Sequence, residues 1–206
     1  MYKPTEREYR SFSAFEPKEN ESGLLVLCGI PIVFNKPTVI FEDEETGVQY
    51  KEVIDPHFLD SCDMSDFILN RNHGMNDGTV FARTKNGSLR YDIGTENVII
   101  EADLDNEDER HRNLYRDVKK KRIDQMSFSF TFFSRAEGGW RYDPETHTRY
   151  CLRAKKMYDV SAVDFPAYKD TSITTARSFF TEESRKEIKA LEERRRRQLL
   201  IIKTLL

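Results

Sequence analysis

Residues 125–133, QMSFSFTFF, alternate strictly between two kinds of side chain. Met126 and three phenylalanines occupy one set of positions, and Ser127, Ser129 and Thr131 lie between them. Successive side chains of a β-strand point to opposite faces, so this period of two predicts a strand with an aromatic face toward the core and a row of hydroxyls on its other face. In an isolated strand such hydroxyls usually face solvent. A chemical role for them therefore requires partners from elsewhere in the chain.

The composition excludes several classes of protein. The 206 residues carry a formal charge of −3, from 33 basic and 36 acidic side chains, so the global basic field of a nucleic-acid-binding protein is lacking. Cys28, Cys62 and Cys151 are odd in number and unpaired in spacing, which argues against a disulfide framework or a structural zinc site and favours a reducing cytoplasm. Without a long apolar run or an apolar N-terminal signal core, the sequence predicts neither membrane insertion nor signal-directed export.

Apolar runs and turn residues predict a chain made mostly of strands. A short helix is expected at about residues 55–62, after Asp55-Pro56, and a longer one at about 106–121, with Asn106 as a possible cap. We expect strands at residues 24–32, 39–41, 48–54, 67–71, 79–84, 88–93, 98–104, 125–133, 149–153 and 157–163. The three at 79–104 are spaced like a meander.

The predicted fold is α+β, a mostly antiparallel, barrel-like sheet with flanking helices and a C-terminal amphipathic helix. Residues 1–178 form the expected domain, and 179–206 form a charged tail without glycine or proline. In that tail Arg194 to Arg197 interrupt an apolar stripe. Two readings of the tail stay open, a helix that packs on its own domain and one that binds a partner.

A serine hydroxyl becomes a strong nucleophile only when an imidazole accepts its proton. Of the four histidines, His57 begins a predicted helix, His111 lies on a highly charged helix and His147 in a polar hairpin. His73 ends an apolar strand, at the edge of the expected core. His73 is therefore the best candidate partner for a serine of the hydroxyl row.

A metal hydrolase built on His57, His73 and His111 is a weaker hypothesis. These histidines lie on different predicted elements, and none forms a His-x-x-x-His pair. We expect no metal and no cofactor.

Six short motifs occur in an order and spacing that resemble a known family. They are Arg7–Phe12, Glu52–Pro56, Asn72-His73, Ala82–Thr84, Asp124–Phe128 and Asp159–Tyr168. Together they resemble the prohead serine proteases of tailed bacteriophages, whose fold is similar to that of the herpesvirus assembly proteases. The resemblance spans about residues 6–177. Each motif alone is weak, and their order carries the comparison.

The resemblance implies roles for particular residues. Ser127 would be the nucleophile and His73 the general base. Relatives differ in whether an acid or a second histidine is the third member, and our choice is Asp159, for which a surface acid is the alternative reading. Ser161 lies on the same strand face as Asp159 and is a candidate hydrogen-bonding support, with simple packing as the alternative.

This chain departs from the family pattern at three positions. Relatives often have glycine after the helix and within the Met-Ser-Phe motif, where this chain has Lys121 and Ser129, and they commonly have Asn-His-Asp where this chain has Gly74. Ser129 is therefore expected to narrow the site or adjust specificity, with loss of activity as a further reading. Candidate oxyanion donors are backbone N–H groups near Ser127 and an arginine such as Arg83.

The resemblance implies a serine endopeptidase of viral procapsid maturation. It would act in the host cytoplasm, inside the assembling procapsid, on scaffold protein, on capsid-protein segments and on itself. Homo-oligomerisation through the tail, scaffold or capsid binding by the tail, and removal of the tail are further expectations, whereas nucleic acid and membrane are not expected partners. The alternative is a non-catalytic structural or scaffolding component of a phage assembly.

Overall fold

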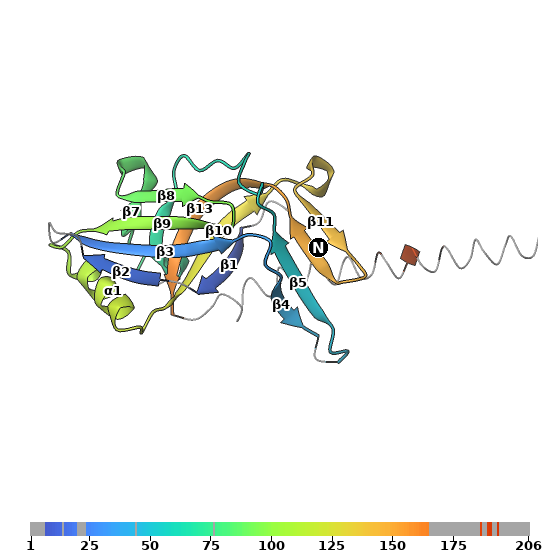
Figure 1. The fold of residues 1–206 in the computed structure, drawn as a ribbon, viewed down its shortest axis with the longest axis horizontal. Helices are drawn as coiled ribbons and strands as arrows, with labels where there is room; N and C mark the ends of the chain where they lie inside the picture. Colours follow the sequence, from blue (N-terminus) through green and yellow to red (C-terminus); the bar gives the residue numbers. More distant parts are fainter. Residues whose placement is uncertain are drawn as a thin grey trace, which may run out of the picture.

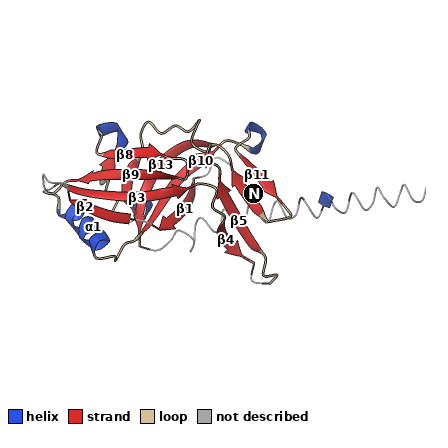
Figure 2. Cartoon of the chain, viewed as in Figure 1, coloured by secondary structure: helices blue, strands red, loops and turns tan. Residues whose placement is uncertain are grey.

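The computed structural model describes residues 7–13, 15–19, 24–43, 45–75 and 77–164, together with residues 186, 189, 190 and 193. Strands dominate these residues (Figure 2), and they form three sheets. The mixed α+β class is confirmed. The barrel-like expectation is not met, because the described strands form three open sheets and close no barrel.

The central sheet has five strands and contains the QMSFSFTFF segment. In spatial order they are β1 (Glu8–Ser13), β10 (Gln125–Phe132), β13 (Ala154–Val163), β6 (Ile68–Arg71) and β7 (Ala82–Arg83). β13 runs parallel to β6 and antiparallel to β10. Segments that are far apart in the chain therefore become neighbours in this sheet.

A second sheet carries the one α-helix found among the described residues. Its strands, in order, are β2 (Phe15–Glu19), β3 (Leu25–Val33), β9 (Asn97–Leu104) and β8 (Leu89–Ile93). Helix α1 (Glu109–Lys119) lies beside β2 in Figure 1 and buries residues at helical spacing, His111, Leu114, Tyr115 and Val118. No helix of the described residues is long and apolar enough to cross a membrane.

The third sheet lies at the opposite end of the molecule from α1 (Figure 1). Its strands, in order, are β11 (Trp140–Asp143), β12 (Thr148–Cys151), β5 (Gln49–Ile54) and β4 (Thr38–Glu42). Three short 3-10 turns complete the described elements, η1 (Asn72–Gly74), η2 (Thr84–Asn86) and η3 (Arg135–Glu137).

The aromatic face of β10 lies in the core, as its alternation predicts. Phe128, Phe130 and Phe132 are at most 2% exposed. Phe128 and Phe130 stack with ring centroids 5.1 Å apart, and Phe58 meets Phe130 edge to face at 5.2 Å. These contacts fix β10 against the rest of the core.

Several local predictions are wrong. Residues 56–61 form successive turns with i to i+3 hydrogen bonds, such as Phe58 N–H to Asp55 O at 2.9 Å, and no α-helix forms there. The meander fails because β7 pairs with β6, while β8 pairs with β9. Helix α1 begins later than expected, and Asp108 caps it where Asn106 was expected. β1 and β2 were not anticipated, because their polar sequences show little hydrophobic alternation.

The expected tail at 179–206 lies outside the described residues apart from four isolated positions. The division into a domain and a tail, and the tail's partners, therefore stay predictions.

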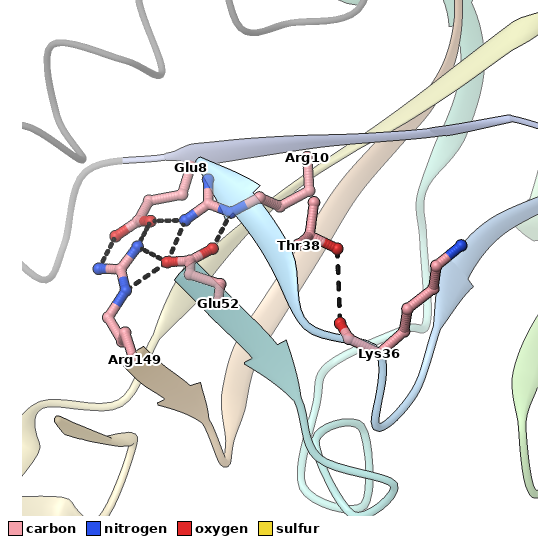
Figure 3. Close-up of polar contacts among 6 residues, drawn as sticks. All are labelled: Glu8, Arg10, Lys36, Thr38, Glu52 and Arg149. Carbon is pink, nitrogen blue, oxygen red and sulfur yellow. Dashed lines mark hydrogen bonds and ion pairs between the residues drawn. The ribbon is translucent and has the colours of Figure 1, made fainter. Parts of the chain in front are cut away.

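A cluster of four buried charges joins the central sheet to the third sheet. Glu8 and Arg10 come from β1, Glu52 from β5 and Arg149 from β12, and none is more than 3% exposed. Each guanidinium contacts both carboxylates (Figure 3): Arg149 lies 2.6 Å from Glu8, and Arg10 lies 2.5 Å from Glu8 and 2.7 Å from Glu52. Arg149 also contacts Glu52. Two cations and two anions thus neutralise one another inside the protein.

The cluster lies on the aromatic side of β10. Its two arginines sit over aromatic rings, Arg10 at 5.7 Å from the Phe130 centroid and Arg149 at 5.3 Å from that of Phe132. Burial alone would lower the pKa of Arg10, but the Glu52 and Glu8 carboxylates raise it above its ordinary value. Arg10 therefore stays charged, and removal of any one member leaves an uncompensated buried charge.

We predict that Arg149→Ala lowers the free energy of unfolding by about 3 to 5 kcal/mol, because Glu8 and Glu52 would remain buried next to a single cation. Urea unfolding followed by circular dichroism measures this change. The control is Arg122→Ala, which breaks an exposed pair with Asp117 and is expected to cost about 1 kcal/mol or less. If Arg149→Ala does not fold, Arg149→Lys supplies the comparison, and equal stabilities of Arg149→Lys and the unmodified chain would contradict the prediction.

Candidate active site

The register of β10 with β13 places four polar residues together on the face opposite the aromatic core. Ser127 lies opposite Ser161, and Ser129 lies opposite Asp159. Directly paired residues of antiparallel strands point to the same face. All four are at most 3% exposed. The row of hydroxyls therefore faces a polar neighbouring strand and not solvent.

His73 lies in a left-handed turn directly after β6, the strand that pairs with β13 on the side away from β10. Asn72, His73 and Gly74 follow β6 directly and have φ angles of 47°, 56° and 74°. Left-handed backbone costs roughly 1–2 kcal/mol for a residue with a side chain, so a histidine in this conformation needs support from its surroundings. Gly74 adopts its own positive φ without that cost.

Hydrogen bonds to β13 and to the residue after it hold this turn. The His73 N–H donates to Ser161 Oγ at 2.9 Å. The Asn72 side chain donates to the Asp164 carboxylate at 2.8 Å and accepts from the Asp164 N–H at 3.1 Å. Arg71 also donates to Asp164, at 2.7 Å. These bonds fix the His73 backbone relative to the strand that carries Asp159.

The Asp164 carboxylate is ionised under ordinary conditions. Partial burial alone would raise the pKa of Asp164, but the hydrogen bond from Asn72 and the Arg71 guanidinium lower it below its usual value. The charge that holds the turn is therefore present at neutral pH.

The imidazole of His73 connects an alcohol and a carboxylate. Nδ1 lies 2.6 Å from Asp159 Oδ1, and Nε2 lies 2.8 Å from Ser127 Oγ. A carboxylate that is ionised only accepts hydrogen bonds, so beside one a neutral ring would carry its proton on Nδ1 and Nε2 would accept from the Ser127 hydroxyl. This is the orientation in which an imidazole removes a proton from an alcohol.

The second oxygen of Asp159 also has a partner. The Ser129 hydroxyl donates a short hydrogen bond to Asp159 Oδ2. The carboxylate is therefore held at both oxygens, by His73 and by Ser129. The Ser129 hydroxyl therefore points at Asp159, and its expected effect on substrate specificity stays a prediction.

The three groups are enclosed in this structure. The His73 and Asp159 side chains are 6% and 4% exposed, and Ser127 has no exposed surface. A low local dielectric strengthens hydrogen bonds among them. Because Ser127 is enclosed, a substrate carbonyl reaches it only after neighbouring groups move.

At Lys121 the departure from the family pattern has a backbone explanation. Lys121, which follows α1, has a φ of 54°, a conformation that glycine adopts more easily.

Arg83, a candidate oxyanion donor, makes a two-bond pair with Asp66, at 2.7 and 2.6 Å, and lies on β7, three strands from β10. Strands are spaced by about 4.8 Å, so the backbone of β7 lies roughly 14 Å from that of β10 across the sheet, and the identity of the oxyanion donors stays a prediction.

The remaining histidines and the cysteines lie elsewhere. His57 pairs with Asp60 on the surface, and His147 lies 3.2 Å from the Tyr142 hydroxyl. Within the described ranges no group of three metal-binding side chains occurs. Burial raises the pKa of Cys62 to about 12 and that of Cys151 well above its ordinary value, so neither thiol is ionised at neutral pH.

Comparison with known families agrees with this geometry. The family model of caudovirus prohead serine proteases matches residues 13–186. This chain belongs to that family. The prohead proteases are serine proteases of phages, and the family assigns the chain a protease role in procapsid maturation, inside the procapsid, with capsid or scaffold proteins as substrates. No curated protein and no solved structure matched, so the likeness to herpesvirus proteases stays a prediction.

Sequence reasoning named Ser161 as a candidate support, but it did not assign a supporting role to Asn72 or Asp164. Asp164 and Asn72 are separated by 92 positions, and each alone is an ordinary polar residue. The only available signal was the motif context, since Asn72 precedes His73 and Asp164 follows the strand of Asp159. Pairing between them becomes visible only once β6 and β13 are aligned.

We predict that the resting His73 imidazole is protonated at Nδ1 and unprotonated at Nε2 at pH 8, because Asp159 accepts from Nδ1. Nitrogen-15 NMR of the histidine side chains distinguishes the two tautomers. Asp159→Asn is expected to change this preference, since an amide presents a donor as well as an acceptor. The exposed His57 is the internal control, and a His73 ring protonated at Nε2 in the unmodified chain would contradict the assignment.

Proposed function

We propose that the chain hydrolyses peptide bonds with Ser127 as nucleophile, His73 as general base and Asp159 as the orienting acid. The observation that carries this proposal is the continuous chain of hydrogen bonds from Ser127 Oγ through the imidazole to Asp159. Its three members come from β10, the turn after β6 and β13. Membership of a serine protease family supports the same assignment.

The chemistry follows from the positions of the protons. Ser127 Oγ attacks the carbonyl carbon of the scissile bond while its proton passes to His73 Nε2. The C–N bond then breaks, and the same proton goes to the departing amine, which leaves an ester on Ser127. Water next attacks the ester carbon while His73 Nε2 takes one of its protons. The ester C–O bond then breaks, His73 returns this proton to Ser127 Oγ, and the acid product is released.

Asp159 acts through the imidazole. Its carboxylate keeps the proton on Nδ1, which leaves Nε2 free to accept, and it stabilises the imidazolium that forms in each step. Ser129 holds the second carboxylate oxygen, and Ser161 holds the His73 backbone. Both serines are positioning residues, because neither touches the reacting bond.

The substrates that we propose are scaffold protein, capsid-protein segments and this chain itself. The family role in procapsid maturation supports the first two. We further propose that the tail at 179–206 binds scaffold or capsid protein, that self-cleavage removes it, and that the chain forms homo-oligomers. Tail retention in mature particles would count against removal.

We predict that Ser127→Ala abolishes cleavage of a co-expressed capsid or scaffold protein and all self-cleavage, because it removes the hydroxyl that is hydrogen-bonded to His73 Nε2. Intact-mass spectrometry distinguishes fragments from the uncut chain of 24.3 kDa. A fluorophosphonate probe is expected to label Ser127, followed over hours because the residue is buried. Modified peptides are located by mass spectrometry.

The matched control is Ser61→Ala, which removes an exposed serine hydroxyl that accepts a hydrogen bond from Arg153. It is expected to leave cleavage and labelling unchanged. If Ser127→Ala still produces the fragments of the unmodified chain, the proposed nucleophile is wrong. If the unmodified chain shows neither fragments nor labelling, the non-catalytic structural role replaces the proposal.

We predict that Ser129→Ala lowers kcat roughly tenfold with little change in KM, because Asp159 loses one of its two hydrogen bonds and holds the imidazole less firmly. Ser129→Thr, which keeps a hydroxyl, is expected to restore most of the rate. A purely structural role would instead lower stability without this separation of kcat from KM. Equal kcat in Ser129→Ala and the unmodified chain would show that the hydrogen bond has no part in catalysis.

A further inference from the structure

A cavity of about 210 Å³ lies beside β10, where β10 pairs with β13. Its lining residues are Thr131, Phe132, Lys155, Lys156 and Tyr158. Thr131 is the third member of the hydroxyl row, and its register partner is Lys156. The cavity is therefore on the same face of the central sheet as Ser127, further along the strand.

The rim of this cavity is positively charged. Lys155 is exposed and makes no ion pair among the described residues. Lys156 is 37% exposed and pairs with Asp63 at 2.9 Å. The guanidinium of Arg7 lies 3.8 Å from the centre of the Tyr158 ring, at the same end of β13. Three cations thus stand near two carboxylates, those of Asp63 and Glu137.

The acids nearest these cations already have other partners. Asp63 accepts hydrogen bonds from the Ser65 hydroxyl at 2.6 Å and from its N–H at 3.1 Å. Glu137, which lies near Lys155, is held by Ser134, whose hydroxyl and N–H both donate to it. Neither carboxylate forms an ion pair with Lys155 among the described residues, although Glu137 is close enough to interact with it electrostatically.

The distance from the nucleophile suits an extended peptide. Thr131 is four residues from Ser127, which corresponds to about 13 Å along a strand. A substrate in extended conformation over this face, with its scissile carbonyl at Ser127, covers the same distance with about four residues. Once the groups that enclose Ser127 have moved, a side chain at that point of such a substrate would lie level with Thr131, which lines the cavity.

We propose that this cavity is a substrate subsite that accepts an aspartate or glutamate side chain about four residues from the scissile bond. The proposal rests on the proposed proteolytic function of Ser127. The Lys155 and Lys156 ammonium groups attract the carboxylate and the Thr131 hydroxyl gives it a hydrogen-bond donor, whereas a lysine or arginine side chain is repelled. Acidic segments of the substrate are thereby selected over basic ones.

The experiment uses a synthetic peptide library in which each position carries glutamate or glutamine in matched pairs. Cleavage products of the unmodified full chain are identified by mass spectrometry, which also shows on which side of the cut the preference falls. At one position about four residues from the cut, we expect kcat/KM to be about five- to tenfold higher for glutamate than for glutamine. This is the size of effect expected when a carboxylate interacts with two exposed or partly exposed cations. This preference should decrease when salt is raised.

The double variant Lys155→Glu, Lys156→Glu is expected to lose or invert the preference. Because Lys156→Glu also breaks the pair with Asp63, Lys155→Ala alone is measured too and is expected to reduce the preference. The control is Lys36→Glu, Lys120→Glu, which makes the same charge change at two exposed lysines away from the cavity and should keep the preference. A glutamate preference that is absent, or equal in the variant and the control, overturns the subsite.

A binding measurement separates failure of the subsite from failure of the proteolytic function. The same library is passed over immobilised Ser127→Ala chain with and without the Lys155→Glu, Lys156→Glu change. Enrichment of glutamate peptides that depends on the two lysines supports the subsite even if no peptide is cut. Fluorophosphonate labelling of Ser127 without such enrichment retains the protease and removes the subsite.

Discussion

The pairing of β10 with β13 is the constraint on which the rest of the site depends. Its register sets Ser127 opposite Ser161 and Ser129 opposite Asp159. Because a shift of one residue would turn every side chain of β10 to the other face, the aromatic core on one side fixes the hydroxyls on the other. The buried phenylalanines therefore hold the register that brings the Ser127 hydroxyl to the His73 imidazole.

The strained turn after β6 completes this arrangement. A histidine at the end of a straight strand would continue the alternation of that strand, whereas the left-handed backbone at residues 72–74 turns the chain across the face of β13. The energy of this conformation is offset by hydrogen bonds from Asn72 to Asp164 and from the His73 N–H to Ser161. Strain that is held in this way keeps the ring in one orientation before substrate arrives.

Local patterns predicted two parts of the site, and the choice of Ser127 and Asp159 came from the family resemblance. Period-two alternation identified β10, and the position of His73 after an apolar strand marked it as a partner. The buried cluster was not predictable, because Glu8, Arg10, Glu52 and Arg149 are separated by up to 141 positions and charged residues normally indicate surface. At residues 55–62 the Asp-Pro start favoured a helix, but each i to i+3 bond closes a separate turn. Contacts between distant segments determine the buried cluster and the turns at residues 55–62, and these contacts cannot be read from a single sequence.

The order of the strands along the chain has a consequence for the timing of activity. The imidazole and its carboxylate are 86 positions apart, and β1 meets its charged partner Arg149 only near the end of the sheet-forming sequence. Chains are synthesised from the N-terminus, and contacts between distant segments form late in folding. While a ribosome is still making the segment before β13, the growing polypeptide holds a serine and a histidine but lacks the acid that aligns them. The hydrogen-bonded group of Ser127, His73 and Asp159 can therefore form only after β13 has been made, which would delay activity under the proposed mechanism.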